Sequence, residues 1–172
     1  MLFNVDNRLP WLLVAISALA LEGTALFFQY GLKLDPCVLC IYQRTAVGGI
    51  ALGGLIGAIA PAIVWLRILG YLGFGSAAVI GVNLALEHIA VQRGETMGCD
   101  FFANFPAWAK LDEWFPAVFQ PTGSCDEIKW SFLGHSMPEW MVVVFGAYLA
   151  ALVFALWLEV RRFQHPRGRE TA

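Results

Sequence analysis

Long apolar runs separated by polar connections dominate the chain. A bilayer core needs about 20 mainly apolar residues per spanning helix. Four runs meet this length, at residues 10–30, 38–60, 68–86 and 140–158. The runs are continuous rather than alternating, which favours helices over the strands of a membrane barrel. The pattern therefore predicts an all-α membrane protein, a bundle of four transmembrane helices that forms a single integral membrane domain over residues 1–172.

Composition agrees with this pattern. Hydrophobic residues make up 59% of the 172 residues and charged residues 14%, compared with roughly 45–50% and 25% in soluble domains. Four spans leave little room for a separate soluble domain. The formal net charge is −2, and the sequence has no basic patch with interleaved aromatic residues. Nothing in the sequence therefore indicates a nucleic-acid partner.

Basic residues are distributed unequally between the two sides of the predicted bundle. With four spans, both termini and the connection at 61–67 lie on one side, and the connections at 31–37 and 87–139 lie on the other. The first side has about one basic residue in five positions, and the second about one in fifteen. Because Lys and Arg gather on the cytoplasmic side, we predict cytoplasmic termini and two external connections.

All four cysteines fall on the side predicted to be external: Cys37, Cys40, Cys99 and Cys125. An even number of cysteines on an oxidising face predicts two disulfides or two dithiol pairs, with three possible connectivities. Two purely structural disulfides are an alternative to redox chemistry. A zinc site made of four thiolates is disfavoured, because no second Cys-x-x-Cys and no ligand histidines complete it. No metal site is therefore predicted.

The segment LDPCVLCIYQR, residues 34–44, places a Cys-x-x-Cys pair at the outer end of the second span. Asp35 is a good N-cap and Pro36 suits the first helical position, so we predict that a helix begins here. Cys40 and Arg44 are four residues apart and share a helical face. A fixed positive charge stabilises a thiolate, the species that attacks disulfides and donates electrons. The alternative role for Arg44 is that of an interfacial anchor.

The second pair of cysteines lies in an aromatic-rich connection. Phe and Trp occupy seven positions between Cys99 and Cys125, namely Phe101, Phe102, Phe105, Trp108, Trp114, Phe115 and Phe119. Together with the charged residues Lys110, Asp112 and Glu113, they predict a short amphipathic helix at the membrane interface. A loop folded around a buried aromatic cluster is the alternative.

Three smaller signals lie within the spans. Gly49, Gly53 and Gly57 recur every four residues and predict a small-residue face for close helix packing. Glu22 lies in the middle of the first span, where an ionisable group is costly, and a hydrogen bond to a neighbouring helix is expected for it. His88 ends the third span at the depth of the Cys-x-x-Cys pair, either as an aid to an electron acceptor or as an ordinary interfacial histidine.

Taken together, these motifs resemble the disulfide bond formation protein B (DsbB) family. The resemblance rests on the four spans and on five motifs: PCVLCIYQR opening the second span, EH closing the third, CDFF and GSCDE in the long connection, and MPEW opening the fourth. It covers nearly the whole chain, with the motifs in the family's order. Gln43 stands where some members carry an acid.

The resemblance implies a membrane thiol:quinone oxidoreductase of the bacterial inner membrane. A disulfide between Cys99 and Cys125 would be attacked at Cys99 by a DsbA-type periplasmic oxidase with a thioredoxin fold. Cys125 would then pass the electrons to Cys37. These roles are what the family resemblance implies, and the residues alone leave the pairing of the cysteines open.

The resemblance also implies the exit route of the electrons. Cys40, beside Arg44, would reduce ubiquinone or menaquinone from the membrane pool, with Arg44 binding the quinone and His88 assisting. A vitamin K epoxide reductase-like enzyme is one alternative, although its active pair normally lies near the last helix of its bundle. A non-catalytic membrane scaffold held by disulfides is another.

Overall fold

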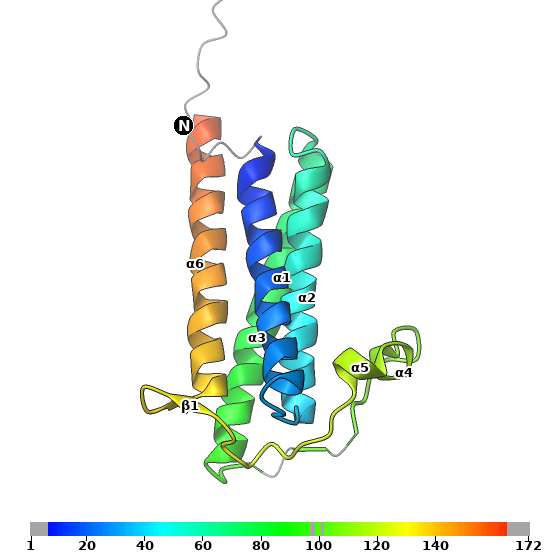
Figure 1. Ribbon diagram of the computed structural model, residues 1–172. Helices are drawn as coiled ribbons and strands as arrows, with labels where there is room; N and C mark the ends of the chain where they lie inside the picture. Colours follow the sequence, from blue (N-terminus) through cyan, green and yellow to red (C-terminus); the bar gives the residue numbers. More distant parts are fainter. Residues whose placement is uncertain (1–6, 97–98, 101, 165–172) are drawn as a thin grey trace, which may run out of the picture.

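A bundle of four long helices forms the body of the computed structural model, which describes residues 7–96, 99–100 and 102–164 (Figure 1). The helices are α1 (Arg8–Tyr30), α2 (Val38–Ile59), α3 (Val64–Gln92) and α6 (Met137–Gln164). All four are long and apolar enough to cross a membrane. The predicted fold class is confirmed, and the protein is a multi-pass membrane protein.

Two helices extend beyond the apolar runs seen in the sequence. Helix α3 continues to Gln92, six residues past the run at 68–86, and α6 begins at Met137, so the long connection is shorter than 87–139. Pro138 falls in the first turn of α6, where its missing N–H has no cost. Phe101 in the aromatic connection and the C-terminal basic residues Arg167 and Arg169 lie outside the described residues.

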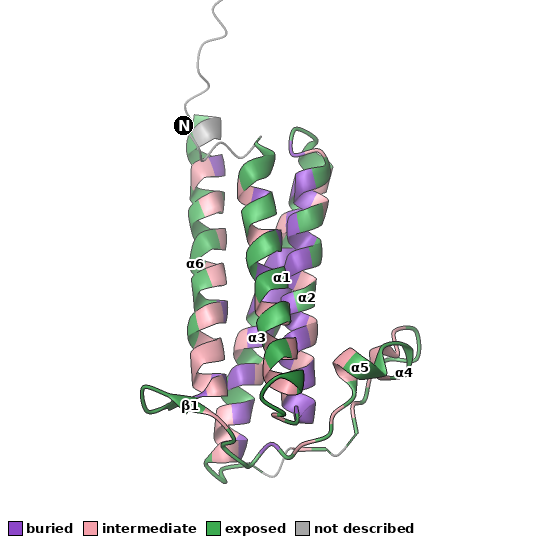
Figure 2. Cartoon of the chain, viewed as in Figure 1, coloured by how far each residue is buried: buried purple, intermediate pink, exposed green. Residues whose placement is uncertain are grey.

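Helix α2 is the central helix of the bundle. It packs against both α1 and α3, while α6 packs against α3. Figure 2 shows the consequence: buried residues concentrate on α2 and α3, and much of α1 and α6 is exposed. The exposed apolar side chains of these outer helices, such as Leu13, Ile16 and Val153, face the lipid.

Glycines on α2 permit the close approach of its neighbours. A Cβ atom at Gly53 would lie 2.5 Å from the backbone nitrogen of Phe74 in α3, and one at Gly57 would overlap the indole ring of Trp11 in α1. An added side chain would require a shift of the α3 backbone at Gly53 and a shift of the Trp11 ring at Gly57. The predicted small-residue face is confirmed, and it serves two helix interfaces.

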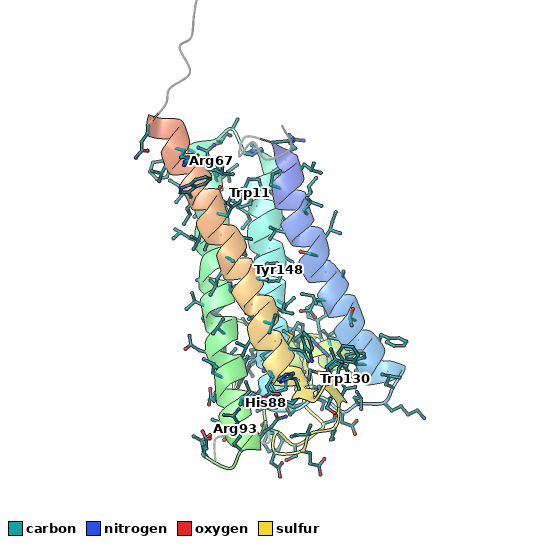
Figure 3. The ribbon with its side chains drawn as sticks, turned by 90° about the vertical axis from the view of Figure 1, so that its left-hand side faces the viewer. Trp11, Arg67, His88, Arg93, Trp130 and Tyr148 are labelled. Carbon is teal, nitrogen blue, oxygen red and sulfur yellow. A yellow bond between two sulfur atoms is a disulfide. The ribbon has the colours of Figure 1, made fainter. Side chains whose placement is uncertain are left out.

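A buried ion pair closes one end of the bundle. The Nε atom of Arg67 in α3 lies 2.7 Å from a carboxylate oxygen of Glu159 in α6, and both side chains are buried. Figure 3 shows Arg67 and Trp11 at this end and His88 and Trp130 at the opposite end. We refer to the end that holds His88, Cys37 and Cys40 as the cysteine end.

The connection between α3 and α6 covers the cysteine end (Figure 1). It contains two single-turn helices, α4 (Leu111–Trp114) and α5 (Pro116–Phe119), and two short strands, β1 (Ser131–Phe132) and β2 (His135–Ser136). The strands pair antiparallel, with Ser131 opposite Ser136 and Phe132 opposite His135. The predicted amphipathic segment is thus two separate turns, because Pro116 cannot donate a backbone hydrogen bond to a helix continuing from α4.

The aromatic residues of this connection divide into two groups. Phe105 packs edge-on against Tyr42 of α2, with ring centroids 5.5 Å apart, and Phe119 packs against Phe105 at 6.4 Å. Trp108 and Trp114, by contrast, are 80% and 57% exposed. One group therefore docks the connection on the bundle, and the other is free to contact the membrane interface.

Candidate active site

The Cys-x-x-Cys pair lies at the start of α2. Cys37 is the N-cap residue, and its sulfur accepts a hydrogen bond from the backbone N–H of Cys40 at 3.3 Å. The prediction of Asp35 as N-cap and Pro36 as first helical residue is wrong. The carbonyl of Pro36 instead accepts hydrogen bonds from the backbone N–H groups of residues 122–123, so this segment pairs with the long connection before the helix begins.

The two thiols of this pair are free and in contact. The Cys37 and Cys40 sulfurs lie 2.8 Å apart, and Cys37 is 2% exposed. The hydrogen bond between the Cys37 thiol and the Cys40 sulfur, together with burial, raises the pKa of Cys37. Cys37 therefore keeps its proton and donates a hydrogen bond to the Cys40 sulfur, so a negative charge on this pair is better placed on Cys40 than on Cys37.

His88 reaches the pair from α3. Its Nε2 atom lies 3.6 Å from the Cys37 sulfur, and its Nδ1 atom lies 3.2 Å from the side-chain nitrogen of Gln43. The ring is 3% exposed and also lies against the backbone of Cys125. The position of His88 at the end of α3 thus brings one imidazole into contact with both cysteine pairs.

Arg44 lies one helical turn deeper than Cys40, with 7% of the residue exposed. Its Nη1 atom donates hydrogen bonds to the side-chain oxygen of Gln29, at 2.9 Å, and to the carbonyl of Val118 in α5. Its Nε atom lies 3.7 Å from the carboxylate of Glu22. The guanidinium of this α2 residue is therefore held between α1 and α5, in a buried position where its charge is poorly screened.

The long connection carries the second cysteine pair next to the first. Cys99 and Cys125 form a disulfide, with 6.0 Å between their Cα atoms. A buried cluster, the cysteine cluster, consists of Cys37, Val38, Leu39, Val91 and Cys125, with Cys40 and Cys99 packed against it. Within the disulfide, Cys125 is fully buried and Cys99 is partly exposed. A thiolate arriving from solvent therefore reaches Cys99 more readily than Cys125.

A cavity of about 260 Å³ opens beside the Cys-x-x-Cys pair. All four long helices and the connection contribute to its walls, including Phe28, Cys40, Arg44, His88, Trp130 and Met141. Mainly apolar walls with a few convergent polar groups are typical of a small-molecule site. Its position between helices of a membrane bundle suits an apolar ring that carries hydrogen-bond acceptors, which Arg44 can bind.

Sequence reasoning missed several residues of this site. Gln43 follows Cys40 by three residues, and Gln29 follows Glu22 by seven, so helical spacing was an available signal for both. Met141 had no such signal, because an apolar helix sequence does not specify which residues face a cavity and which face lipid. Trp130 had none either, because it lies outside the helices, in the long connection just before β1. The carboxylate partner of Arg44 is Glu22 of α1, while Gln43 contacts His88.

Known proteins similar to this chain share one family description. The family model for Disulfide bond formation protein DsbB matches residues 7–155. The chain is 50% identical to disulfide bond formation protein B of Psychromonas ingrahamii over 153 residues, which cover 87% of this chain and 83% of that protein. It is 46% identical to that of Mannheimia succiniciproducens over 166 residues, covering 95% and 93% of the two chains. The chain therefore belongs to the DsbB family of disulfide-forming membrane proteins.

Proposed function

We propose that the protein reoxidises a soluble periplasmic dithiol oxidase of the DsbA type and delivers the electrons to a membrane quinone, either ubiquinone or menaquinone. One observation carries the proposal: two cysteine pairs share the cysteine cluster, one in the surface connection and the other on the wall of an apolar cavity. Thiol exchange runs in water, but quinones dissolve in lipid. A relay between them needs one pair on each side of this boundary.

Electrons enter at the connection. A thiolate of the partner attacks Cys99, because Cys125 is fully buried, and the Cys99–Cys125 bond breaks as a mixed disulfide forms. The second thiol of the partner then displaces Cys99. The partner leaves with a disulfide, and Cys99 and Cys125 are left as a dithiol that has gained two electrons and two protons.

Electrons then pass between the pairs. With Cys37 and Cys40 oxidised, the Cys125 thiolate attacks Cys37, and Cys40 leaves as a thiolate that the charge of Arg44 stabilises. Cys99 attacks Cys125 in the mixed disulfide and restores the bond of the connection. Cys37 recovers a proton, so the two electrons now reside on the pair beside the cavity.

The cavity completes the route. When bound, a quinone accepts two electrons and two protons and becomes a quinol. Arg44, held by Gln29 and the carbonyl of Val118, presents a fixed positive charge to a carbonyl oxygen in the cavity. With the Gln43 amide turned so that its oxygen accepts from Nδ1–H, His88 Nε2, at 3.6 Å from the Cys37 sulfur, takes the proton of Cys37 as the Cys37–Cys40 bond closes. This is one of the two protons of the quinol, and water supplies the second.

The relay requires the cysteine end to face the periplasm and both termini to face the cytoplasm, as the arginine asymmetry indicates. A reporter fused after Arg169 then behaves as cytoplasmic, and one inserted near Asp112 behaves as external. Both reporters on the same side of the membrane would contradict this orientation.

A quinone-dependent oxidation assay tests the proposal. The purified protein, mixed with a reduced DsbA-type oxidase and quinone, should oxidise the partner and convert quinone to quinol in equal amounts. Cys99→Ser should abolish capture of the partner, while added quinone still keeps Cys37 and Cys40 oxidised. Cysteine pairs that neither quinone nor partner can alter would instead identify a structural scaffold.

A further inference from the structure

We propose that the reduced pair Cys37 and Cys40, together with His88, forms a three-ligand site for a thiophilic divalent cation of the zinc class. Each residue offers one ligand atom, and the three atoms lie within 4.8 Å of one another. Binding of the metal rests on this geometry alone. Its consequence, a block of electron transfer from the pair, rests on the function proposed above.

The distances are close to those of a tetrahedral zinc site. Zn–S bonds of about 2.3 Å and Zn–N bonds of about 2.0–2.1 Å place neighbouring S and N ligands roughly 3.5 Å apart and two sulfurs roughly 3.8 Å apart. The Cys37 sulfur and His88 Nε2 are already 3.6 Å apart. The two sulfurs, at 2.8 Å, must separate by about 1 Å, so metal binding requires the Cys40 side chain to rotate away from Cys37.

The side-chain amide of Gln43 can support either tautomer of His88. Its side-chain amide lies 3.2 Å from Nδ1 of His88. In the orientation found, the amide nitrogen donates to Nδ1, so a neutral ring carries its proton on Nε2. Rotating the amide by half a turn presents its oxygen to an Nδ1–H group and frees the Nε2 lone pair. Such an acceptor behind the ring is the usual support of a metal-bound histidine.

Charge and surroundings suit a zinc-class ion. Two thiolates neutralise a divalent cation, so the occupied site adds no net charge to a buried position. Thiolate and imidazole ligands select zinc or cadmium over magnesium and calcium. The cavity beside the pair leaves room for a fourth ligand, as in Cys₂His sites that keep an open position.

The site exists in one redox state. A Cys37–Cys40 disulfide has no thiolates to offer, and Cys99 and Cys125 are already bonded to each other. A cation therefore binds the reduced pair and holds both sulfurs, so they can neither close into a disulfide nor pass electrons on. Zinc occupation thus stops turnover reversibly, with the electrons retained on the pair.

Cobalt spectroscopy tests the binding. In the full chain carrying Cys99→Ser and Cys125→Ser, reduced without oxygen and freed of reductant, added Co²⁺ should produce the thiolate-to-cobalt charge-transfer and tetrahedral visible bands. Equimolar Zn²⁺ should bleach them. His88→Ala should weaken binding more than about tenfold, since even the loss of a supporting partner costs 10–100-fold. The matched control is His135→Ala, which replaces an exposed histidine of β2 that lies beside Glu139.

Two results would overturn the site. If His88→Ala binds the metal as tightly as its parent, the two thiols bind it without the histidine. If the reduced parent shows no cobalt bands, the pair does not form a metal site. His88→Gln, which keeps a polar side chain of similar length but ligates zinc poorly, provides the same comparison if the alanine variant does not fold. Helical circular dichroism establishes folding for each variant.

A turnover assay tests the consequence separately. Zn²⁺ should inhibit quinone-dependent oxidation by the wild-type protein, and EDTA should restore it. Full activity with zinc bound would overturn the block while leaving the site intact. A protein with cobalt bands but no quinone-dependent activity under any condition would instead contradict the proposed function, so the two failures are distinguishable.

Discussion

Glu22 of α1 and Arg44 of α2 form an ion pair within the spanning part of the bundle, with 3.7 Å between Oε2 of Glu22 and Nε of Arg44. The other oxygen of Glu22 is buried and has no hydrogen-bond partner in the described part of the chain. Both residues line the cavity beside the Cys-x-x-Cys pair, and Cys40 is part of the same wall. Glu22 therefore acts as the counter-ion that allows a permanent cation to remain beside this thiol, at a depth where either charge alone is costly.

Replacing Glu22 by Gln removes the charge of this side chain and keeps its size and shape. The variant leaves the buried Arg44 without its counter-ion. Loss of one partner of a fully buried pair costs about 3 kcal/mol or more, and the Glu22 side chain is 18% exposed, so we expect a loss below about 3 kcal/mol. The local field becomes more positive, so alkylation of Cys40 at neutral pH should become severalfold faster. Thermal unfolding in detergent and a thiol-labelling time course measure the two effects.

The buried ion pair between Arg67 and Glu159 supplies a matched control for this variant. Glu159→Gln removes a carboxylate from the pair with Arg67, at the end of the bundle away from the cysteines. It should lower thermal stability to a similar extent and leave Cys40 labelling unchanged. Faster labelling in both variants would mean that general loosening of the bundle, rather than local charge, controls Cys40.

Arg44 substitutions should have the opposite effect on Cys40. Arg44→Ala removes the nearest fixed positive charge, so Cys40 alkylation at neutral pH slows and the quinone KM rises. Arg44→Lys should restore much of the labelling rate but less of the quinone binding, because an ammonium lacks the planar fork of donors that Gln29 and the carbonyl of Val118 hold in place. If Arg44→Ala keeps the wild-type rate of Cys40 alkylation and the wild-type quinone KM, Arg44 acts only as an interfacial anchor.

The sequence predicted the helices of this protein well because each depends on a local property. Four runs of apolar residues long enough for a bilayer specify four helices, and glycines four residues apart specify a close-packed face. The start of α2 was misplaced because its cause is not local. Pro36 is held by backbone groups of residues 122–123, and no property of the segment around Asp35 reveals that partner.

The same distinction applies to the site. Cys40 and Arg44 are one helical turn apart, so their relationship could be predicted from spacing. The contact of Glu22 with Arg44 and that of His88 with Cys37 join different helices. Their rotation about the helix axes depends on which faces pack together, and nearly uniform apolar sequences carry little information about that.

The pH dependence of the alkylation rate of Cys37 should show the effect of its hydrogen bond to Cys40. A raised pKa means a smaller thiolate fraction than in an ordinary cysteine, whose pKa is about 8.5. Alkylation of Cys37 in the reduced protein should therefore remain slow through pH 8.5 and rise only at higher pH. Cys40→Ala removes the larger cause and leaves burial, so the midpoint of its pH profile should fall towards the ordinary value. Equal midpoints in the two proteins would assign the shift to burial alone.

The contact between Gly57 and Trp11 gives the last prediction, which concerns packing. Trp11 is 4% exposed, and its ring lies between α2 and Tyr71, with 4.6 Å between the two ring centroids. A methyl group at Gly57 overlaps this ring, which also lies against Gly70 of α3. Gly57→Ala should therefore destabilise the bundle by about 1–3 kcal/mol, the usual cost of overpacking.

Gly48→Ala is the control for Gly57→Ala, because it lies on the same helix, is exposed, and has nothing within 4 Å of the added Cβ. This variant should unfold at or slightly above the wild-type temperature, since alanine is the better helix former. The two variants change the backbone propensity of α2 equally and differ only in what the methyl group meets. If both unfold at the same temperature, α1 must be able to move away from α2 at little cost, and the close contact at Gly57 does not determine the stability of the bundle.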